Sequence, residues 1–271
     1  MTATLALGTP GPVDLAAAGQ PRHGWPYWWA GYRSMLRWHL VSLRLWLAVL
    51  AVVQVLSGVG FVLGFGLFFA DIPLPVALFA STGVPVINLV MVGLILGPQL
   101  VADQKASQSF DFIHSLPVPH TAAALAWYTV CLIGGVPAVA VSVGVAVLRY
   151  DGLPVAVSAD VVPAMALTAF AGTMLGYAIA HAIGSPMVTR MITQLIVFGL
   201  FGFTPILFPA TQMPGWLATV NDWLPFGHAA DMVRASLTDL PFPDLARSYV
   251  IVVVWAVVAG ALAVRALGRR K

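Results

Sequence analysis

Six long apolar stretches with almost no charged residue dominate this chain. A helix rises 1.5 Å per residue, so about 20 residues cross the roughly 30 Å hydrocarbon core of a bilayer. Only 8% of the residues are charged and 60% are hydrophobic, which is too little charge for a water-exposed surface. The sequence therefore predicts an all-α polytopic membrane protein. Its six transmembrane helices are expected at about residues 45–70, 76–101, 121–148, 161–183, 190–208 and 247–267.

The distribution of basic residues predicts the orientation. With the N-terminus placed in the cytoplasm, only Arg149, Arg234 and Arg247 of the 13 Lys and Arg residues fall outside. Because cytoplasmic loops carry the excess of Lys and Arg, both termini are expected in the cytoplasm, as an even number of spans requires. The predicted location is a bacterial cytoplasmic membrane. Since the basic residues form no patch, no nucleic-acid partner is predicted.

The chain before the first span divides into two parts. Residues 1–24 are rich in Ala, Gly and Pro without an early basic region, so we expect a disordered cytoplasmic tail and not a signal peptide. Residues 25–271 form one transmembrane domain. Residues 25–40 place aromatic residues on one helical face and arginines on another, which is typical of a helix in the membrane interface. The residues that mark this interfacial helix are Trp28, Trp29, Tyr32, Arg33 and Arg37.

The loop between spans two and three, ADQKASQSFDFIHSLPVPH, is the largest polar segment on the inner side. Asp103 favours a helix N-terminus, and Pro117 and Pro119 end a helix before the next span. We expect one amphipathic helix over residues 102–116, with Phe110, Ile113 and Leu116 as an apolar stripe. Such a stripe fits a groove on a partner protein; an ordinary capped loop is the alternative.

Residues 204–244, after span five, carry six prolines in an otherwise apolar stretch. Proline at this density breaks a helix into short pieces. The segment is too apolar for an ordinary exposed loop and too broken for a further span. It predicts short re-entrant helices that dip into the outer leaflet; a loop lying on the membrane is the alternative.

Motifs for chemistry are missing from the sequence. There is no Gly-rich phosphate loop, no HExxH and no nucleophile elbow. The chain is therefore not expected to be an enzyme, to hold a metal or to bind a cofactor of its own. The predicted spans also have no ionisable group at mid-membrane depth, and His181, the one histidine inside a span, lies near its end. This lack of ionisable groups disfavours an ion-driven transporter.

The order of these parts resembles the permease subunits of ABC-2-type transporters, over roughly residues 28–266. Those permeases have six spans after an interfacial helix, and a cytoplasmic coupling helix between spans two and three. The motifs that carry the resemblance are Asp103 with HSLPVPH at 114–120, MPGWL at 213–217, WLPF at 223–226 and VRASL at 233–237. The family often has Glu where this chain has Asp103, whose side chain is one methylene shorter.

The resemblance implies an exporter of a hydrophobic or amphipathic drug, antibiotic or lipid, driven by a separate ATP-binding subunit in two copies that binds ATP and Mg. It also implies a second permease chain, as a homodimer or with a paralogue, and a pathway lined by spans one, two and five. The implied coupling residues are Asp103, Gln104, Lys105, Phe110, Asp111, Phe112, His114 and Leu116. Candidate pathway residues are Gln54, Phe61, Phe65, Asn88, Phe198 and Phe201. The alternatives are a secondary transporter or channel that needs no ATPase, and a membrane immunity or assembly protein.

Overall fold

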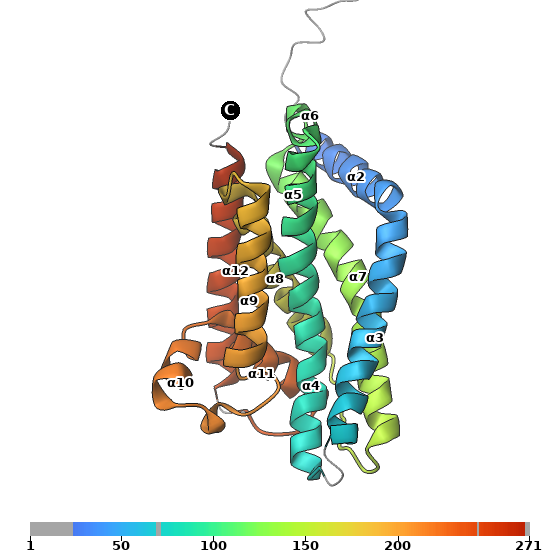
Figure 1. The fold of residues 1–271 in the computed structure, drawn as a ribbon, viewed down its shortest axis with the longest axis vertical. Helices are drawn as coiled ribbons and strands as arrows, with labels where there is room; N and C mark the ends of the chain where they lie inside the picture. Colours follow the sequence, from blue (N-terminus) through green and yellow to red (C-terminus); the bar gives the residue numbers. More distant parts are fainter. Residues whose placement is uncertain (1–23, 69–71, 243, 269–271) are drawn as a thin grey trace, which may run out of the picture.

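The structure, a computed structural model, describes residues 24–68, 72–242 and 244–268, and within these ranges every regular element is a helix and none is a strand (Figure 1). Residues 1–23 of the tail predicted over 1–24 lie outside the described part. The helices are α2 (Trp25–Ser42), α3 (Arg44–Phe68), α4 (Leu74–Met91), α5 (Gly97–Ala106), α6 (Ser109–Ser115), α7 (His120–Arg149), α8 (Val161–Ala182), α9 (Pro186–Phe203), α10 (Gly215–Asn221), α11 (Pro225–Leu237) and α12 (Leu245–Gly268). A π-helical turn, η1 (Val92–Leu96), joins α4 to α5, and a 3-10 turn, η2 (Ala210–Gln212), precedes α10.

Within the described ranges, six helical stretches are long and apolar enough to cross a membrane, which confirms the predicted fold class. They are Arg44–Gly64, Leu74–Ala106, His120–Arg149, Val161–Ala182, Pro186–Phe203 and Leu245–Ala266. Both described ends of the chain, α2 and the last turn of α12, lie at the same end of the bundle as α6 (Figure 1). We call this the inner end, from the predicted orientation, and the end with α10 the outer end.

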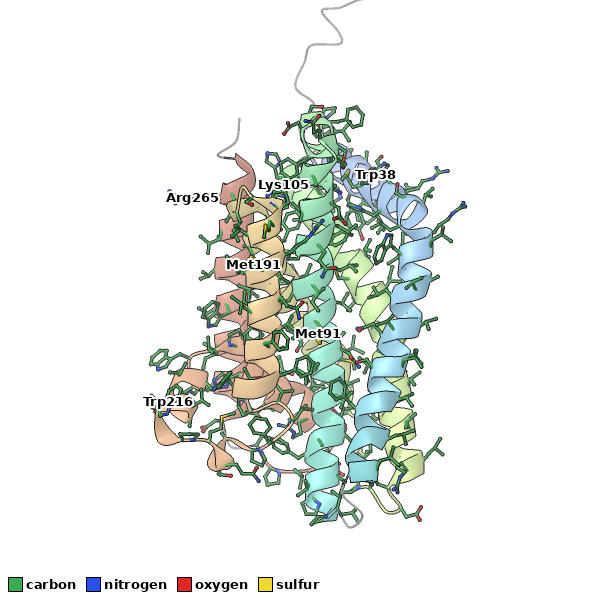
Figure 2. All side chains as sticks on the ribbon, in the orientation of Figure 1. Trp38, Met91, Lys105, Met191, Trp216 and Arg265 are labelled. Carbon is green, nitrogen blue, oxygen red and sulfur yellow. The ribbon has the colours of Figure 1, made fainter. Side chains whose placement is uncertain are left out.

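The unbroken stretch of α4, η1 and α5 forms the centre of the bundle. In its most apolar window 83% of the residues are buried, against 17% in α3 and 22% in both α9 and α12. Helices α3, α9 and α12 therefore present most of their surface to lipid or to another chain. Lys105, Met91 and Trp216 mark the inner end, the middle and the outer end of the bundle in Figure 2.

Close backbone packing holds the central stretch against α8. A Cβ added to Gly176 would lie 2.2 Å from the carbonyl oxygen of Gly93, so only glycine fits at this position. Gly172 lies close to Val90, because a Cβ added to Gly172 would lie 3.1 Å from the Cα atom of Val90. On another side, α8 packs extensively along α12. Helix α8 is therefore enclosed by the centre of the bundle and by the last span.

The fifth span is shifted from the predicted 190–208, because its ends are set by local signals. The Ser185 side chain accepts a hydrogen bond from the backbone N–H of Val188, and Pro186 occupies the first helical turn, so the helix begins at Pro186. It ends at Phe203, since Thr204 is extended and Pro205 follows. Arg190 thus lies inside the helix and does not mark its end.

The helix expected over residues 102–116 is in fact two helices. Helix α5 ends at Ala106, and α6 begins at Ser109 after a turn in which Gln108 adopts a left-handed conformation with φ 59°. The Ser107 and Ser109 hydroxyls both contact the carbonyl of Gln104, at 3.3 and 3.5 Å. These serines bond to the backbone at the point where a straight helix would continue, which favours the break. Asp103 lies within α5 and caps no helix.

Candidate coupling site and transport pathway

The turn between α5 and α6 is fastened to the inner end of α8 by Lys105. Its Nζ donates to the carbonyl oxygens of Ala180 and Ile183, at 2.6 Å each, and lies 5.2 Å from the centre of the Phe110 ring. The last carbonyls of a helix have no partner within the helix and carry partial negative charge, so an ammonium group is well placed there. Lys105, one of the implied coupling residues, thus serves as a C-terminal cap of α8.

Phe110 also belongs to the interior of this chain. Only 6% of its surface is exposed, and it packs with Val101 and Ala180, with the His181 ring 5.9 Å away. Its assignment to a docking surface is therefore corrected. Burying a Phe ring stabilises by about 1.5–3 kcal/mol, so Phe110 fixes α6 to α5 and α8.

The exposed surface of α6 is carried by neighbouring residues. Phe112 is 70% exposed and Leu116 is 37% exposed, and Asp111 is also exposed. The side chain of His114 lies outside the described part, and Gln104 points into a cavity beneath α6. Leu116 lines the same cavity with part of its side chain. Phe110 points inward and Phe112 outward, so the candidate residues of α6 that are exposed and do not line the cavity are Asp111 and Phe112.

Asp103 joins α5 to α9. Its carboxylate accepts a hydrogen bond from the guanidinium of Arg190, and the two side chains are 55% and 52% exposed. An ion pair this exposed contributes about 0–1 kcal/mol. The ion pair therefore matters for position more than for stability, because it links the turn before α6 to the inner end of the fifth span.

Helix α2 is attached to the inner end by its aromatic face. Trp28 Nε1 donates to the Thr121 hydroxyl at 2.9 Å, and the Tyr32 hydroxyl lies 3.0 Å from that of Thr129. The Tyr27 hydroxyl donates to the carbonyl oxygen of Pro117, in the loop that follows α6. Trp25, Trp28, Trp29 and Tyr32 stack on one another, with ring centres 5.1–6.4 Å apart. Arg33 and Arg37 are exposed on the other face.

Two of the candidate pathway residues meet between α3 and α4, near the middle of the bundle. Gln54 Nε2 donates to the backbone carbonyl of Asn88 at 3.0 Å, and the Ser57 hydroxyl donates to Asn88 Oδ1 at 3.2 Å. Asn88 is fully buried, and its Nδ2 has no hydrogen-bond partner among the described residues. An amide without a hydrogen-bond partner at this depth costs free energy. Asn88 lies one turn before the π-helical turn η1. π-Turns are frequent at functional sites.

The phenylalanine candidates divide into two groups. Phe61 of α3 and Phe201 of α9 stack with ring centres 5.5 Å apart. Phe198 is 66% exposed and faces away from the chain's own core. The side chain of Phe65 lies outside the described part. The structure therefore brings Gln54 to Asn88 and Phe61 to Phe201.

Sequence reasoning missed the buried arginine at the outer end. Arg234 of α11 is 1% exposed, with Nη2 2.9 Å from the carbonyl oxygen of Ile206 and Nε 3.1 Å from the Thr82 hydroxyl. Nη1 pairs with Asp231 at 3.0 Å, and the guanidinium lies 3.5 Å from the centre of the Phe79 ring. Burial lowers the pKa of Arg234 to about 10, so the group stays charged at neutral pH. These contacts tie α11 and the turn after α9 to α4.

Comparison with known proteins agrees with this arrangement. A protein-family model described as ABC-2 family transporter protein matches residues 74–265, well over half of the chain. The matched stretch runs from the start of α4 to Arg265 in the last turn of α12, and it includes α5, α6 and the outer helices α10 and α11. A search of curated proteins found no match. The match confirms the resemblance seen in the sequence, and the chain belongs to the ABC-2 family of transporter membrane proteins.

Proposed function

We propose that this multi-pass permease is the membrane subunit of an ATP-driven exporter, powered by two copies of a separate ATP-binding subunit. The observation that carries the proposal is the exposed Phe112 on α6. An aromatic side chain that is 70% exposed beside Asp111 is suited to a groove on a partner. It projects from a short helix that is itself fixed to the rest of the chain by the buried Phe110.

Force applied to α6 would reach three other elements through direct contacts. Lys105 carries it to the end of α8, and Asp103 carries it to Arg190 of α9. Tyr27, which donates to the Pro117 carbonyl, connects the loop after α6 to α2. A push by a nucleotide-driven partner would therefore move α2, α8 and α9 together with α5, which is what a coupling element must do.

The transport pathway would lie between two permease chains, in a homodimer or with a paralogue. Helices α3 and α9 are mostly exposed in the single chain, and they carry Phe61, Phe198 and Phe201. Asn88 and Gln54 would supply polar contacts at mid-depth once α3 shifts away from α4. A surface this apolar suits a hydrophobic or amphipathic cargo, such as a drug, an antibiotic or a lipid. The exporter would lie in a bacterial cytoplasmic membrane with both termini inside.

The first test is Phe112→Asp, with co-purification of an ATP-binding ABC subunit from the native host as the readout. We expect the ATP-binding subunit to be lost while the thermal unfolding temperature stays unchanged, because Phe112 contributes little to the chain's own core. Val157→Asp is the matched control, since Val157 is 63% exposed in the loop between α7 and α8 at the outer end. Retention of the ATP-binding subunit by Phe112→Asp would reject the docking surface.

The second test separates the exporter from a self-sufficient transporter. The purified chain is reconstituted alone into liposomes and assayed with a panel of fluorescent hydrophobic dyes. We expect no concentrative transport without the ATP-binding subunit and ATP. Dye accumulation by the chain alone would overturn the proposal.

A further inference from the structure

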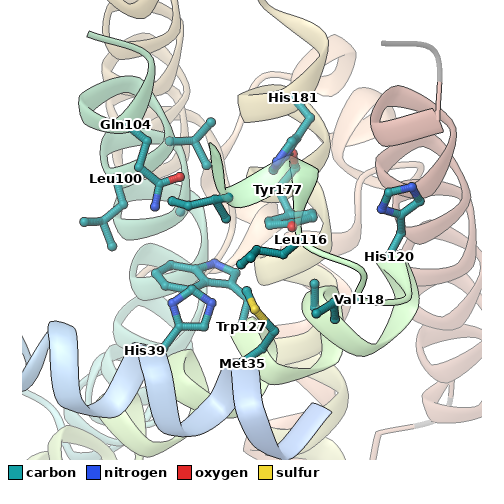
Figure 3. A pocket seen from close by; sticks show the side chains of 14 residues that line it. Met35, His39, Leu100, Gln104, Leu116, Val118, His120, Trp127, Tyr177 and His181 are labelled. Carbon is teal, nitrogen blue, oxygen red and sulfur yellow. The ribbon is translucent and has the colours of Figure 1, made fainter. Parts of the chain in front are cut away.

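Two arginines of the interfacial helix α2 lie on the side that faces away from the rest of the chain. The buried residues of α2 include Met35 and His39, which point toward Trp127 of α7 (Figure 3). Successive residues of a helix turn by about 100°, so Arg33 and Arg37 both lie about 160° around α2 from Met35. Both arginines are exposed. Their side chains therefore point outward, away from α7.

The charge of these two arginines is not neutralised by the described part of the chain. Helix α2 contains no acidic residue, and among the described residues neither Arg33 nor Arg37 forms an ion pair. Side chains four residues apart on a helix are neighbours, with about 5–6 Å between their Cβ atoms, and like charges at this spacing repel. An anion bound by both guanidinium groups would remove this repulsion. Arg44, exposed at the start of α3, adds a third positive charge at the same end of the bundle.

Apolar side chains border the arginines. An open hollow of about 830 Å³ runs along this side of α2, and Arg33 and Arg37 line it together with Trp29, Leu36 and Leu40. Trp29 is 45% exposed, and tryptophan is enriched at the depth of the lipid headgroups. A free inorganic anion would contact only the arginines. A phospholipid would contact the whole surface, with its phosphate on the arginines and its glycerol and upper acyl chains on the apolar residues.

The position of α2 in the bundle brings this surface to the level of the headgroups. Helix α2 crosses the inner end and leads into the span α3 (Figure 1), and Trp38 of α2 lies near the level of Lys105 in Figure 2. In the first turn of α3, Leu45 and Trp46 are 75% and 58% exposed, so lipid-facing apolar surface begins directly after α2. In the predicted orientation this is the cytoplasmic leaflet, whose anionic lipids attract basic residues next to a span.

We propose that Arg33 and Arg37 form a binding site for the headgroup phosphate of an anionic phospholipid in the cytoplasmic leaflet. The planar guanidinium group can donate two parallel N–H bonds to phosphate oxygens. A zwitterionic phospholipid carries a cation beside the same phosphate, so an anionic headgroup is favoured next to two arginines. Because Tyr27 of α2 donates to the carbonyl oxygen of Pro117, a lipid that fixes the depth of α2 also fixes the loop after α6. The site does not depend on the exporter proposal, since it needs no partner subunit.

The test measures phospholipid binding to the purified full-length chain in detergent by native mass spectrometry. The two probes are phosphatidylglycerol and phosphatidylcholine with identical acyl chains, and we expect phosphatidylglycerol to bind more tightly. Each arginine near an anionic headgroup contributes about fivefold in affinity, so the double variant Arg33→Gln with Arg37→Gln should bind phosphatidylglycerol about 25-fold more weakly. Its binding of phosphatidylcholine should change little. Equal affinities of the native chain for the two lipids, or full retention of phosphatidylglycerol by the double variant, would overturn the proposal.

The matched control is the double variant Arg247→Gln with Arg265→Gln. It removes two exposed arginines of α12, and so the same net charge, and it should leave the affinity for phosphatidylglycerol unchanged. An equal loss of affinity in this control would show that net charge alone attracts the lipid, and would reject the site. The variant of Arg33 and Arg37 is also tested for co-purification of the ATP-binding subunit. Loss of that subunit with unchanged lipid binding would assign the two arginines to a protein contact and would overturn the proposal.

Discussion

Replacing Arg234 with Met should strongly destabilise the outer end. The substitution removes the bonds to Ile206 and Thr82 and the ring contact with Phe79, and it leaves Asp231 without its cation. Breaking a buried ion pair from one side costs about 3–5 kcal/mol. The Asp231 side chain is 42% exposed and can be hydrated, so we expect the lower end, about 3 kcal/mol.

For a chain of this size, about 3 kcal/mol corresponds to a fall of about 6–12 °C in the midpoint of thermal unfolding. The assay is size-exclusion chromatography of the heated protein in detergent. Arg149→Met is the control, since that arginine lies 5.4 Å from the centre of the Tyr150 ring at the end of α7 and should lose at most about 1 kcal/mol. Arg234→Lys keeps the charge but loses the planar fork and should be intermediate. If Arg234→Met unfolds within about 2 °C of the wild type, the role of this arginine as a clamp is refuted.

Three further predictions concern the inner end and the centre. Because burial lowers the pKa of His39 from 6.5 to about 4, the unfolded chain takes up a proton that the folded protein excludes. The free energy of unfolding should therefore fall by about 2 kcal/mol from pH 8 to pH 5. In denaturant titrations, the free energy of unfolding of His39→Phe should fall less over that range. Gly176→Ala should cost about 1–3 kcal/mol or more, since its Cβ would lie 2.2 Å from the Gly93 carbonyl oxygen, whereas Gly199→Ala should show no fall in unfolding temperature. Lys105→Met should cost about 2 kcal/mol and speed hydrogen exchange in the last turn of α8; unchanged exchange there would reject the cap.

The six spans were predictable because charge is excluded from the hydrocarbon core and the runs between charges have the required length. The start of the fifth span at Pro186 was also readable, since Ser185 followed by proline is a recognised helix start. The predicted span, 190–208, instead began at the arginine within this stretch, Arg190. A single exposed arginine near the membrane surface does not end a helix.

The inner end was harder to predict for two physical reasons. The break at Gln108 has no glycine or proline to announce it, because here a non-glycine residue adopts the left-handed conformation. Phe110 and Phe112 are chemically alike, and only the direction of α6 after the break decides which one is buried. Lys105 was counted among the positive residues of the inner side, and nothing in its neighbours indicates that it caps a helix 75 residues later.

The enclosure of α8 bears on how the protein is made. Helix α8 carries Thr168 and Thr173, whose hydroxyls are buried, and His181 near its end. It enters the membrane before α12 has been synthesised, and α12 is the span that covers one of its sides. Until translation reaches α12, that side of α8 faces lipid or the insertion machinery. Completion of the bundle therefore waits for the synthesis of α12, and truncation before residue 245 would leave one side of α8 uncovered.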